Sequence, residues 1–169
     1  PLVYQPGEGW VYSVGDDIQG YLVEKLSGQP FPEFLRERIF EPLGMKDTAF
    51  HVDKDKMSRL ATIYQWGGEG LSAMPHDKGV NGPPGLPSGG GGLYSTANDY
   101  LRFAQMLANE GQLDGKRLLA PSTVALMTAN HVPDVVKNQS GKFGIGNYRM
   151  QPGFGFGFDV AIYEEPLEI

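Results

Sequence analysis

The chain has 169 residues, of which 40% are hydrophobic and 20% are charged, and these values are typical of a soluble globular protein. Its net charge of −6 disfavours nucleic acid as a partner, because phosphate binding needs a basic patch. Cysteine is absent, which excludes disulfides, thiolate metal sites and a cysteine nucleophile. No apolar run reaches the roughly 18 residues of a membrane span.

The two ends of the chain favour a piece of a longer protein. The sequence begins at Pro1 and not at methionine, and residues 160–169 resemble a strand that runs out. A processed mature chain is the alternative.

Two helices are predicted near the start. Residues 13–28 have apolar side chains at helical spacing, acidic residues in the first turn and Gly28 as a C-terminal cap. Residues 30–40 form the second helix, which we expect Pro42 to end. The apolar residues expected on the two helices are Val14, Ile18, Tyr21, Leu22 and Leu26, and then Phe31, Phe34, Leu35, Ile39 and Phe40.

Residues 53–92 are expected to be mostly irregular. A short hairpin is predicted over residues 61–74, with Gly67 and Gly68 at its turn. Residues 75–92 are rich in glycine and proline, and a loop of that length inside a compact domain is usually functional or mobile.

The clearest predicted helix covers residues 95–111. Thr96 followed by Asp99 resembles a capping box, and Gly111 is expected to stop the helix. Its expected apolar face consists of Leu101, Ala104, Met106, Leu107 and Ala108.

The last third of the chain predicts three short elements. A tight turn falls within residues 111–119, and a helix over residues 120–131 has Pro121 in its first turn. Residues 153–165 alternate glycine and aromatic residues and then become apolar, which predicts a strand. The fold class expected from these elements is mostly α, with long loops and one short terminal strand.

Two kinds of binding site are disfavoured. His51, His76 and His131 are far apart and lack a metal-binding spacing such as H-E-x-x-H, so we interpret them as surface or loop residues and expect no metal and no cofactor. The glycine run Gly89–Gly92 is not followed by the Lys-Ser/Thr of a nucleotide-binding loop. The run favours close approach of the backbone to a packed element or to a ligand.

No serine stands out as a nucleophile with its base. Residues 85–89, G-L-P-S-G, resemble a nucleophile elbow only loosely, and no serine has a lysine three residues later. Ser13, beside Tyr12, is a candidate only by its position before a helix. Tyr12 is a poor base unless cations lower its pKa from about 10, so residue chemistry alone favours an ordinary packing role for it.

Most of the sequence resembles serine hydrolases of the beta-lactamase and penicillin-binding-protein fold. Residues 6–50 carry a Tyr-Ser element that enters a helix, then a Ser-Gly turn, then F-E-P-L-G-M-K-D-T-A-F. Residues 88–127 match the family's Gly-Gly-Leu, Ser-Thr, Asp-Tyr and Phe-x-x-Met-Leu pattern, and residues 153–160 are similar to the strand that follows. The motifs agree in the right order over almost the whole chain, so the resemblance is specific.

The resemblance implies one of three active-site elements. The family uses a Ser-x-x-Lys nucleophile, a tyrosine element and a Lys-Thr-Gly-like segment, and by position this chain holds only the second. Tyr12 is then the implied general base and Ser13 its polar neighbour. Trp66 begins a Trp-Gly-Gly sequence that precedes the glycine run, whereas the family's third element follows the terminal strand. Trp66 is therefore expected on a loop over the substrate pocket.

Val14 stands where beta-lactamases of this fold have an asparagine that binds the amide side chain of the substrate. Loss of that amide favours a less polar pocket, and Y-S-V-x-x-D resembles the carboxylesterases of this fold. The resemblance implies hydrolysis of a short-chain ester through an acyl-serine intermediate, with Val14, Trp66 and Gly91 beside the substrate. The alternatives are a beta-lactamase or D-Ala-D-Ala carboxypeptidase fragment, and a non-catalytic binding module of the same fold.

The implied architecture is the helical subdomain of the beta-lactamase/transpeptidase-like α/β fold. Residues 1–152 are expected to form this subdomain with its cleft loops, and residues 153–169 a strand of the sheet subdomain. The expected partners are a small-molecule ester and the missing N- and C-terminal segments of the parent chain, without nucleic acid or a membrane span. The chain alone is expected to be inactive and, with an apolar face uncovered, to self-associate. The compartment is left open between bacterial cytoplasm and periplasm.

Overall fold

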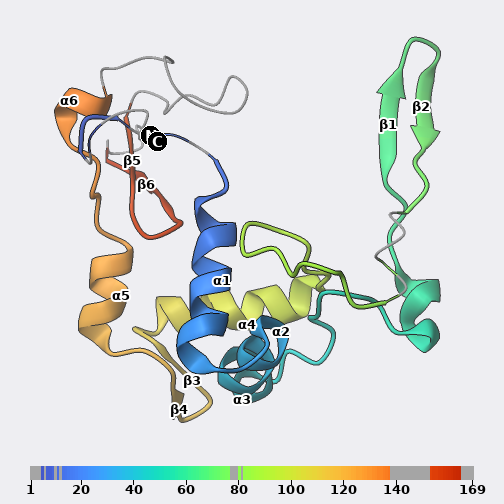
Figure 1. Ribbon diagram of the computed structural model, residues 1–169, viewed down its shortest axis with the longest axis horizontal. Helices are drawn as coiled ribbons and strands as arrows, with labels where there is room; N and C mark the ends of the chain where they lie inside the picture. The colour runs from blue at the N-terminus through green and yellow to red at the C-terminus, as the bar shows by residue number, and fades with distance from the viewer. Residues whose placement is uncertain are drawn as a thin grey trace. The chain divides into compact units, whose positions relative to one another are not determined.

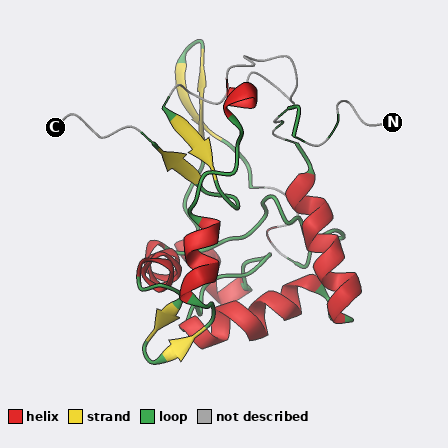
Figure 2. Cartoon of the chain, turned by 90° about the vertical axis from the view of Figure 1, so that its left-hand side faces the viewer, coloured by secondary structure: helices red, strands yellow, loops and turns green. Residues whose placement is uncertain are grey.

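The computed structural model describes residues 5, 7–9, 11, 13–76, 80, 82–137 and 153–164 (Figure 1). Its helices are α1 (Gly15–Ser27), α2 (Phe31–Leu35), the π-helical turn η1 (Arg36–Phe40), α3 (Glu41–Leu43), the 3-10 helix η2 (Lys54–Arg59), α4 (Ala97–Ala108), α5 (Pro121–Met127) and α6 (Asp134–Lys137). The strands form the antiparallel hairpins β1 (Tyr64–Gly67) with β2 (Gly70–Ala73), β3 (Gln112–Leu113) with β4 (Lys116–Arg117), and β5 (Phe154–Phe156) with β6 (Ala161–Tyr163) (Figure 2). Residues 16–103 form one compact unit, and residues 1–15 with 104–169 form a second.

The helix α1 has the predicted ends but does not bury the predicted side chains. Asp16 and Asp17 occupy its first turn, and Gly28 follows its end with a φ of 70° and an N–H that donates to the Glu24 carbonyl at 3.0 Å. The apolar residues that predicted this helix are exposed: Val14, Ile18, Tyr21, Leu22 and Leu26. The spacing predicted the helix correctly, but the helix packs through another side, which carries Gly20.

The helix α1 packs through a glycine. A Cβ on Gly20 would lie 3.0 Å from the Phe31 ring and 3.3 Å from the Cα of Gly89. A Cβ on Gly89 would overlap the carbonyl oxygen of Asp16. The glycine run therefore passes directly against the backbone of α1, which confirms that it allows close approach to a packed element.

The second helix continues beyond its predicted end and contains Pro42. The N–H of Glu41 donates to the carbonyl of Arg36, five residues earlier, so η1 is one wide π-type turn. This turn accommodates Pro42, which has no N–H of its own. The helix ends at Gly44, which has a φ of 68°, and the N–H of Met45 donates to the Phe40 carbonyl at 2.8 Å. The glycine, and not the proline, stops the helix.

The aromatic and aliphatic side chains around this helix form the core of the 16–103 unit. The rings of Phe31 and Phe50 lie with centroids 5.9 Å apart. Burying each such side chain stabilises the fold by about 1.5–3 kcal/mol. The buried hydrophobic residues of the unit are Phe31, Phe40, Leu43, Met45, Phe50 and Val80.

Asp99 is a buried carboxylate in the first turn of α4. Its N–H donates to Thr96 Oγ1 at 3.2 Å, which confirms Thr96 as the cap of this helix. Its Oδ2 accepts the Asp47 N–H at 2.7 Å and the Thr48 hydroxyl at 2.9 Å. One residue thus helps to cap α4 and joins it to the turn after α3.

The buried face of α4 differs in part from the prediction. Met106 is buried and Leu107 half-buried, as expected. The buried Asp99 and the half-buried Arg102 complete this face, and Arg102 Nε donates to the carbonyl of Leu43. The predicted face residues that are exposed instead are Leu101, Ala104 and Ala108.

Two predicted tight turns are confirmed. The hairpin within residues 61–74 turns at Gly68 and Glu69, one residue later than expected. The turn between β3 and β4 is formed by Asp114 and Gly115, with φ values of 49° and 76°. Positive φ at both central residues matches the twist of a two-residue hairpin, and an Asp-Gly pair tolerates it well.

The terminal segment is a hairpin and not the single strand that we predicted. The strands β5 and β6 pair antiparallel, and Asp159, with a φ of 56°, lies in the connection that reverses the chain. The N–H of Phe156 donates to Asn130 Oδ1 at 3.1 Å, which fixes β5 to the segment after α5. The helix α5 has Pro121 in its first turn, as predicted, but it ends at Met127, four residues before its expected end.

Asp47 fixes the turn after α3 to η2. Lys56 Nζ lies 2.9 Å from Asp47 Oδ1, and Arg59 Nη2 lies 2.9 Å from Oδ2. The hydrogen bond from Arg59, followed by that from Lys56, lowers the pKa of Asp47 to about 2. The carboxylate therefore stays ionised well into acid.

Replacing Asp47 is expected to destabilise the protein in a pH-dependent way. The folded pKa lies below the ordinary value, so the stabilisation is present above about pH 4 and is lost as the pH falls through about 2. Asp47→Asn should lower the urea midpoint at neutral pH, and the difference from wild type should shrink between about pH 4 and pH 2. Asp53→Asn is the matched control, since its exposed carboxylate lies 4.0 Å from Lys56 Nζ. A difference that stays constant down to about pH 2 would contradict the role of Asp47.

The glycine run offers a matched pair of substitutions. Gly89→Ala places a Cβ on the Asp16 carbonyl oxygen, whereas a Cβ on Gly91 meets no described residue within 4 Å. We expect Gly89→Ala to lower the free energy of unfolding by about 2 kcal/mol or more, and Gly91→Ala to change it by at most about 0.5 kcal/mol. Urea unfolding of both variants tests this, and equal effects would show that Gly89 does not pack on α1.

Candidate functional site

The tyrosine element is described only in part. Tyr12 itself lies outside the described residues, so its role stays a prediction. Ser13 and Val14 directly precede α1, and both side chains are exposed, Val14 by 53%. A valine this open is accessible to a bound molecule.

Trp66 lies on an exposed hairpin. It is opposite Leu71 in the register of β1 and β2, and Tyr64 is two residues earlier on the same strand. Alternate side chains of a strand share a face, so these three apolar side chains gather on one face of the hairpin. Trp66 is 76% exposed. A large aromatic surface is thus presented by the segment that we expected to cover a pocket.

Gly91 follows a loop segment that is bound to α1. Asp17 Oδ1 accepts the hydroxyl of Ser88 at 2.5 Å and the N–H of Gly90 at 3.4 Å. Ser88, the serine of the loose elbow sequence, therefore donates to a carboxylate. Next to this contact, none of the residues that the structure describes lies within 4 Å of the place where a Cβ of Gly91 would be. Asp17 was not among the site residues predicted from the sequence, and the only signal for it was its place in Y-S-V-x-x-D.

The predicted site residues belong to both compact units. Val14 is part of residues 1–15, and Trp66 and Gly91 are part of residues 16–103. Because no described residue lies within 4 Å of a Cβ on Gly91, Trp66 does not pack on that side of the glycine. The structure therefore shows these three positions as accessible within their own units.

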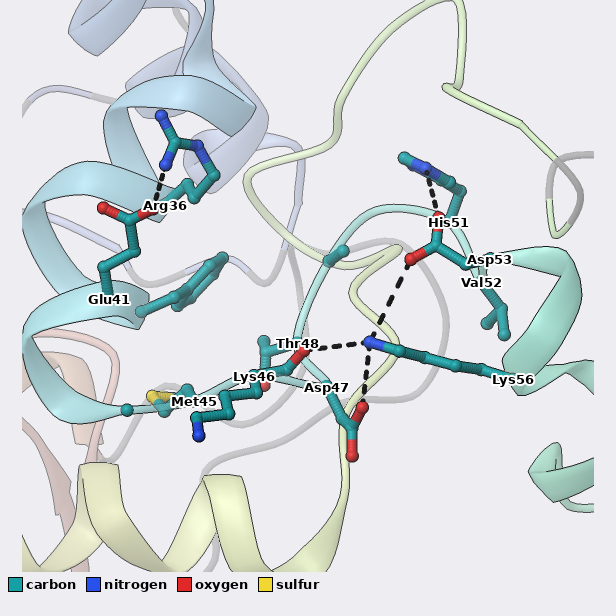
Figure 3. Close-up of a pocket in the computed structure, with 13 residues that line it drawn as sticks. Arg36, Glu41, Met45, Lys46, Asp47, Thr48, His51, Val52, Asp53 and Lys56 are labelled. Atoms are coloured by element: carbon teal, nitrogen blue, oxygen red, sulfur yellow. Dashed lines mark hydrogen bonds and ion pairs between the residues drawn. The ribbon is translucent and has the colours of Figure 1, made fainter.

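A pocket of about 470 Å³ lies elsewhere in the 16–103 unit (Figure 3). Figure 3 shows the Lys56 ammonium between the turn after α3 and the residues before η2. Its Nζ donates to the Lys46 carbonyl at 3.0 Å and forms ion pairs with Asp47 at 2.9 Å and Asp53 at 4.0 Å. Of the predicted site residues that the structure describes, Val14, Trp66 and Gly91 do not line this pocket.

The charged groups of the pocket compensate one another. The hydrogen bond to Asp47 raises the pKa of Lys56, and the hydrogen bond to Glu33 holds the pKa of Arg36 above its usual range. Arg36 is also paired with Glu41 on the opposite side of the pocket (Figure 3). A lysine with a raised pKa is protonated at neutral pH, so it is neither a base nor a nucleophile. We interpret this pocket as a structural ion-pair cluster.

Two histidines have structural contacts. His51 Nε2 lies 3.6 Å from Asp53, and the His131 ring stacks on Phe158 with centroids 4.8 Å apart. Within the described ranges, no three His, Asp or Glu side chains gather as a metal site would require. The helices among those residues are also too short or too polar to cross a membrane.

Comparisons with known protein families, sequences and structures all point to the same family. The family model described as Beta-lactamase matches residues 1–165. Protein Rv1367c of Mycobacterium tuberculosis is 38% identical over 176 residues, which cover 99% of this chain and 41% of that protein. Esterase EstB of Burkholderia gladioli is 30% identical, over 98% of this chain and 42% of the esterase. The LovD6 variant of simvastatin synthase from Aspergillus terreus matches with a TM-score of 0.80 and 26% identity, over 99% of this chain and 44% of that one.

These matches confirm the predicted resemblance and the beta-lactamase/transpeptidase-like fold. The relatives include esterases and D-Ala-D-Ala carboxypeptidase-like proteins. The chain spans about two fifths of the length of the curated relatives that it matches. Since the family model covers nearly all of the sequence, the chain belongs to the beta-lactamase family.

Proposed function

We propose that the chain is part of a serine hydrolase that cleaves short-chain carboxylic esters through an acyl-serine intermediate. The observation that carries this proposal is Val14, two residues after Tyr12, where beta-lactamases of this fold have asparagine. An exposed valine offers no hydrogen bond to the amide side chain of a lactam, so the site favours a less polar substrate. The similarity to an esterase supports the same substrate class.

Tyr12 is the general base in this proposal. Its phenolate takes the proton of the serine hydroxyl while the serine oxygen attacks the ester carbonyl, and the tetrahedral intermediate then expels the alcohol, which receives that proton. Tyr12 next takes a proton from the water that attacks the acyl-serine, and the serine oxygen leaves with it. Lysine ammonium groups of the nucleophile element, from outside residues 1–169, lower the pKa of Tyr12 from its ordinary value of about 10.

Trp66 and Gly91 contact the substrate in this proposal. The hairpin face of Tyr64, Trp66 and Leu71 is apolar and exposed, and such a surface suits the hydrocarbon part of an ester. Gly91 presents backbone without a side chain, which leaves room for a ligand beside it.

The rest of a longer parent protein supplies the other active-site elements. Residues 1–152 form its helical subdomain in this proposal, and the hairpin within residues 153–169 joins its sheet. The apolar side chains that α1 exposes then contact parent segments. Without those segments, the same surface favours self-association.

Tyr12→Phe in the full-length parent tests the proposal. It should lower the rate of acylation by p-nitrophenyl butyrate by about 100-fold or more, because the phenolic oxygen that accepts the proton is gone. Tyr100→Phe is the matched control, since Tyr100 is an exposed tyrosine on α4 without a proposed role. An unchanged rate in Tyr12→Phe would remove Tyr12 from the mechanism.

The isolated chain of residues 1–169 provides the complementary measurement. It holds no Ser-x-x-Lys sequence, so it should show no turnover of p-nitrophenyl butyrate. Clear turnover by this purified chain, abolished by Tyr12→Phe, would show that the nucleophile lies within it.

The choice between ester and lactam rests on Val14. The parent should hydrolyse p-nitrophenyl butyrate in preference to nitrocefin, and Val14→Asn should raise the ratio of nitrocefin to ester turnover by about tenfold, since it restores an amide partner. Stability should change little, because Val14 is exposed. A wild-type preference for nitrocefin would favour the beta-lactamase or carboxypeptidase alternative.

A non-catalytic binding module is the alternative from another functional class. It predicts that the parent sequence lacks Ser-x-x-Lys before this segment. The parent reading frame decides between the two, and absence of that motif would exclude the enzyme.

A further inference from the structure

Two adjacent acids in the first turn of α1 have different partners. Asp16 Oδ1 accepts the side-chain amide of Gln19 at 3.3 Å, within its own helix. Asp17 Oδ1 accepts the hydroxyl of Ser88 and the N–H of Gly90, which are 71 and 73 residues later in the chain. Both carboxylates favour the start of the helix electrostatically, but only Asp17 binds the glycine segment.

The glycine segment is fixed on both sides of Gly91. Ser88 and Gly90 are bonded to Asp17, and between them Gly89 lies against the carbonyl of Asp16. On the far side, Gly92 has a φ of 85°, and the Phe50 ring lies 3.7 Å from the place of its Cβ. Within this run, Gly91 alone has no described residue within 4 Å of that position. A backbone segment that is fixed at both ends and open in the middle is preorganised for contact with a ligand.

Asp17 also belongs to the helix that continues the tyrosine element. The helix α1 begins at Gly15, directly after Val14 and three residues after Tyr12. The carboxylate of Asp17 thus connects the start of this helix with the loop that carries Gly91.

We propose that Asp17 is a positioning residue of the hydrolase site, because it holds Ser88 and Gly90 and thereby sets the path of the backbone around Gly91. This inference rests on the proposed function, in which Gly91 lies beside the ester. Asp17 acts through the loop and not on the reacting atoms, so its loss weakens substrate binding more than it slows the chemical steps.

Steady-state hydrolysis of p-nitrophenyl butyrate by the full-length parent tests this role. Asp17→Ala should raise KM by about fivefold to tenfold and change kcat by less than about twofold. Asp17→Asn keeps an oxygen acceptor and should restore KM to within about twofold of wild type. Asp16→Ala is the matched control, since it removes the same charge from the same helical turn, and its KM should stay at the wild-type value.

Ser88→Ala completes a double-mutant cycle. It should raise KM in the same direction as Asp17→Ala, and the double variant should be no worse than Asp17→Ala alone, because both changes remove one contact. An unchanged KM in Asp17→Ala, an equal rise in Asp16→Ala, or fully additive effects in the double variant would each overturn the proposal.

Hydrogen exchange measures the contact without catalysis. Amides of a peptide covering residues 86–93 should exchange faster in Asp17→Ala than in wild type, and Asp16→Ala should leave them unchanged. Unchanged exchange in Asp17→Ala would overturn the contact itself. A parent that hydrolyses no ester but shows faster exchange in Asp17→Ala would overturn the proposed function and the effect on KM, and would leave the loop contact established.

Discussion

The buried carboxylate of Asp99 is the contact on which the 16–103 unit depends. Only 7% of this residue is exposed, and a buried charge is tolerated only when hydrogen bonds replace its lost hydration. The Asp47 N–H and the Thr48 hydroxyl provide those bonds, and Thr48 also bonds to Ser95, just before α4. These bonds join the turn after α3 to the start of α4, and loss of one partner would leave a buried polar group unsatisfied.

The position of this turn determines the surroundings of the glycine run. Two residues after Thr48, the Phe50 ring packs on Phe31 and lies beside Gly92. Phe31 in turn packs on Gly20 of α1. A series of direct contacts thus links the buried carboxylate to the loop that carries the candidate site. The site's geometry depends on core packing and not only on the loop's own sequence, which explains how a long glycine-rich loop acquires a defined path.

Local rules predicted the elements well, and tertiary contacts decided what they could not predict. Gly28 at the end of α1 and Asp114-Gly115 between β3 and β4 follow from backbone sterics within a few residues, so the sequence suffices for them. Pro42 did not end its helix, because the wide η1 turn accommodates it. Leu26 is 86% exposed although its spacing is helical, because periodicity identifies an apolar side and not the surface that covers it. The hydrogen bonds of Asp17 join residues more than 70 positions apart, and no local pattern reports them.

The role proposed for Tyr12 depends on cations beside its side chain. A tyrosine acts as a base only where cations stabilise its phenolate, and an isolated Tyr-Ser sequence has no such field. Residue chemistry alone favours a packing role for Tyr12, and the family resemblance identifies it as the proposed base. The resemblance also makes Val14 a reason to prefer an ester over a lactam as the substrate. The structure adds a constraint on the loop that carries Gly91. The helix α1 directly follows Tyr12–Val14 in the sequence, and Asp17 in its first turn binds this loop. In the proposed enzyme, one short segment therefore both contributes the base and positions a wall of the cleft, so a change in its helix should alter substrate binding without altering the base.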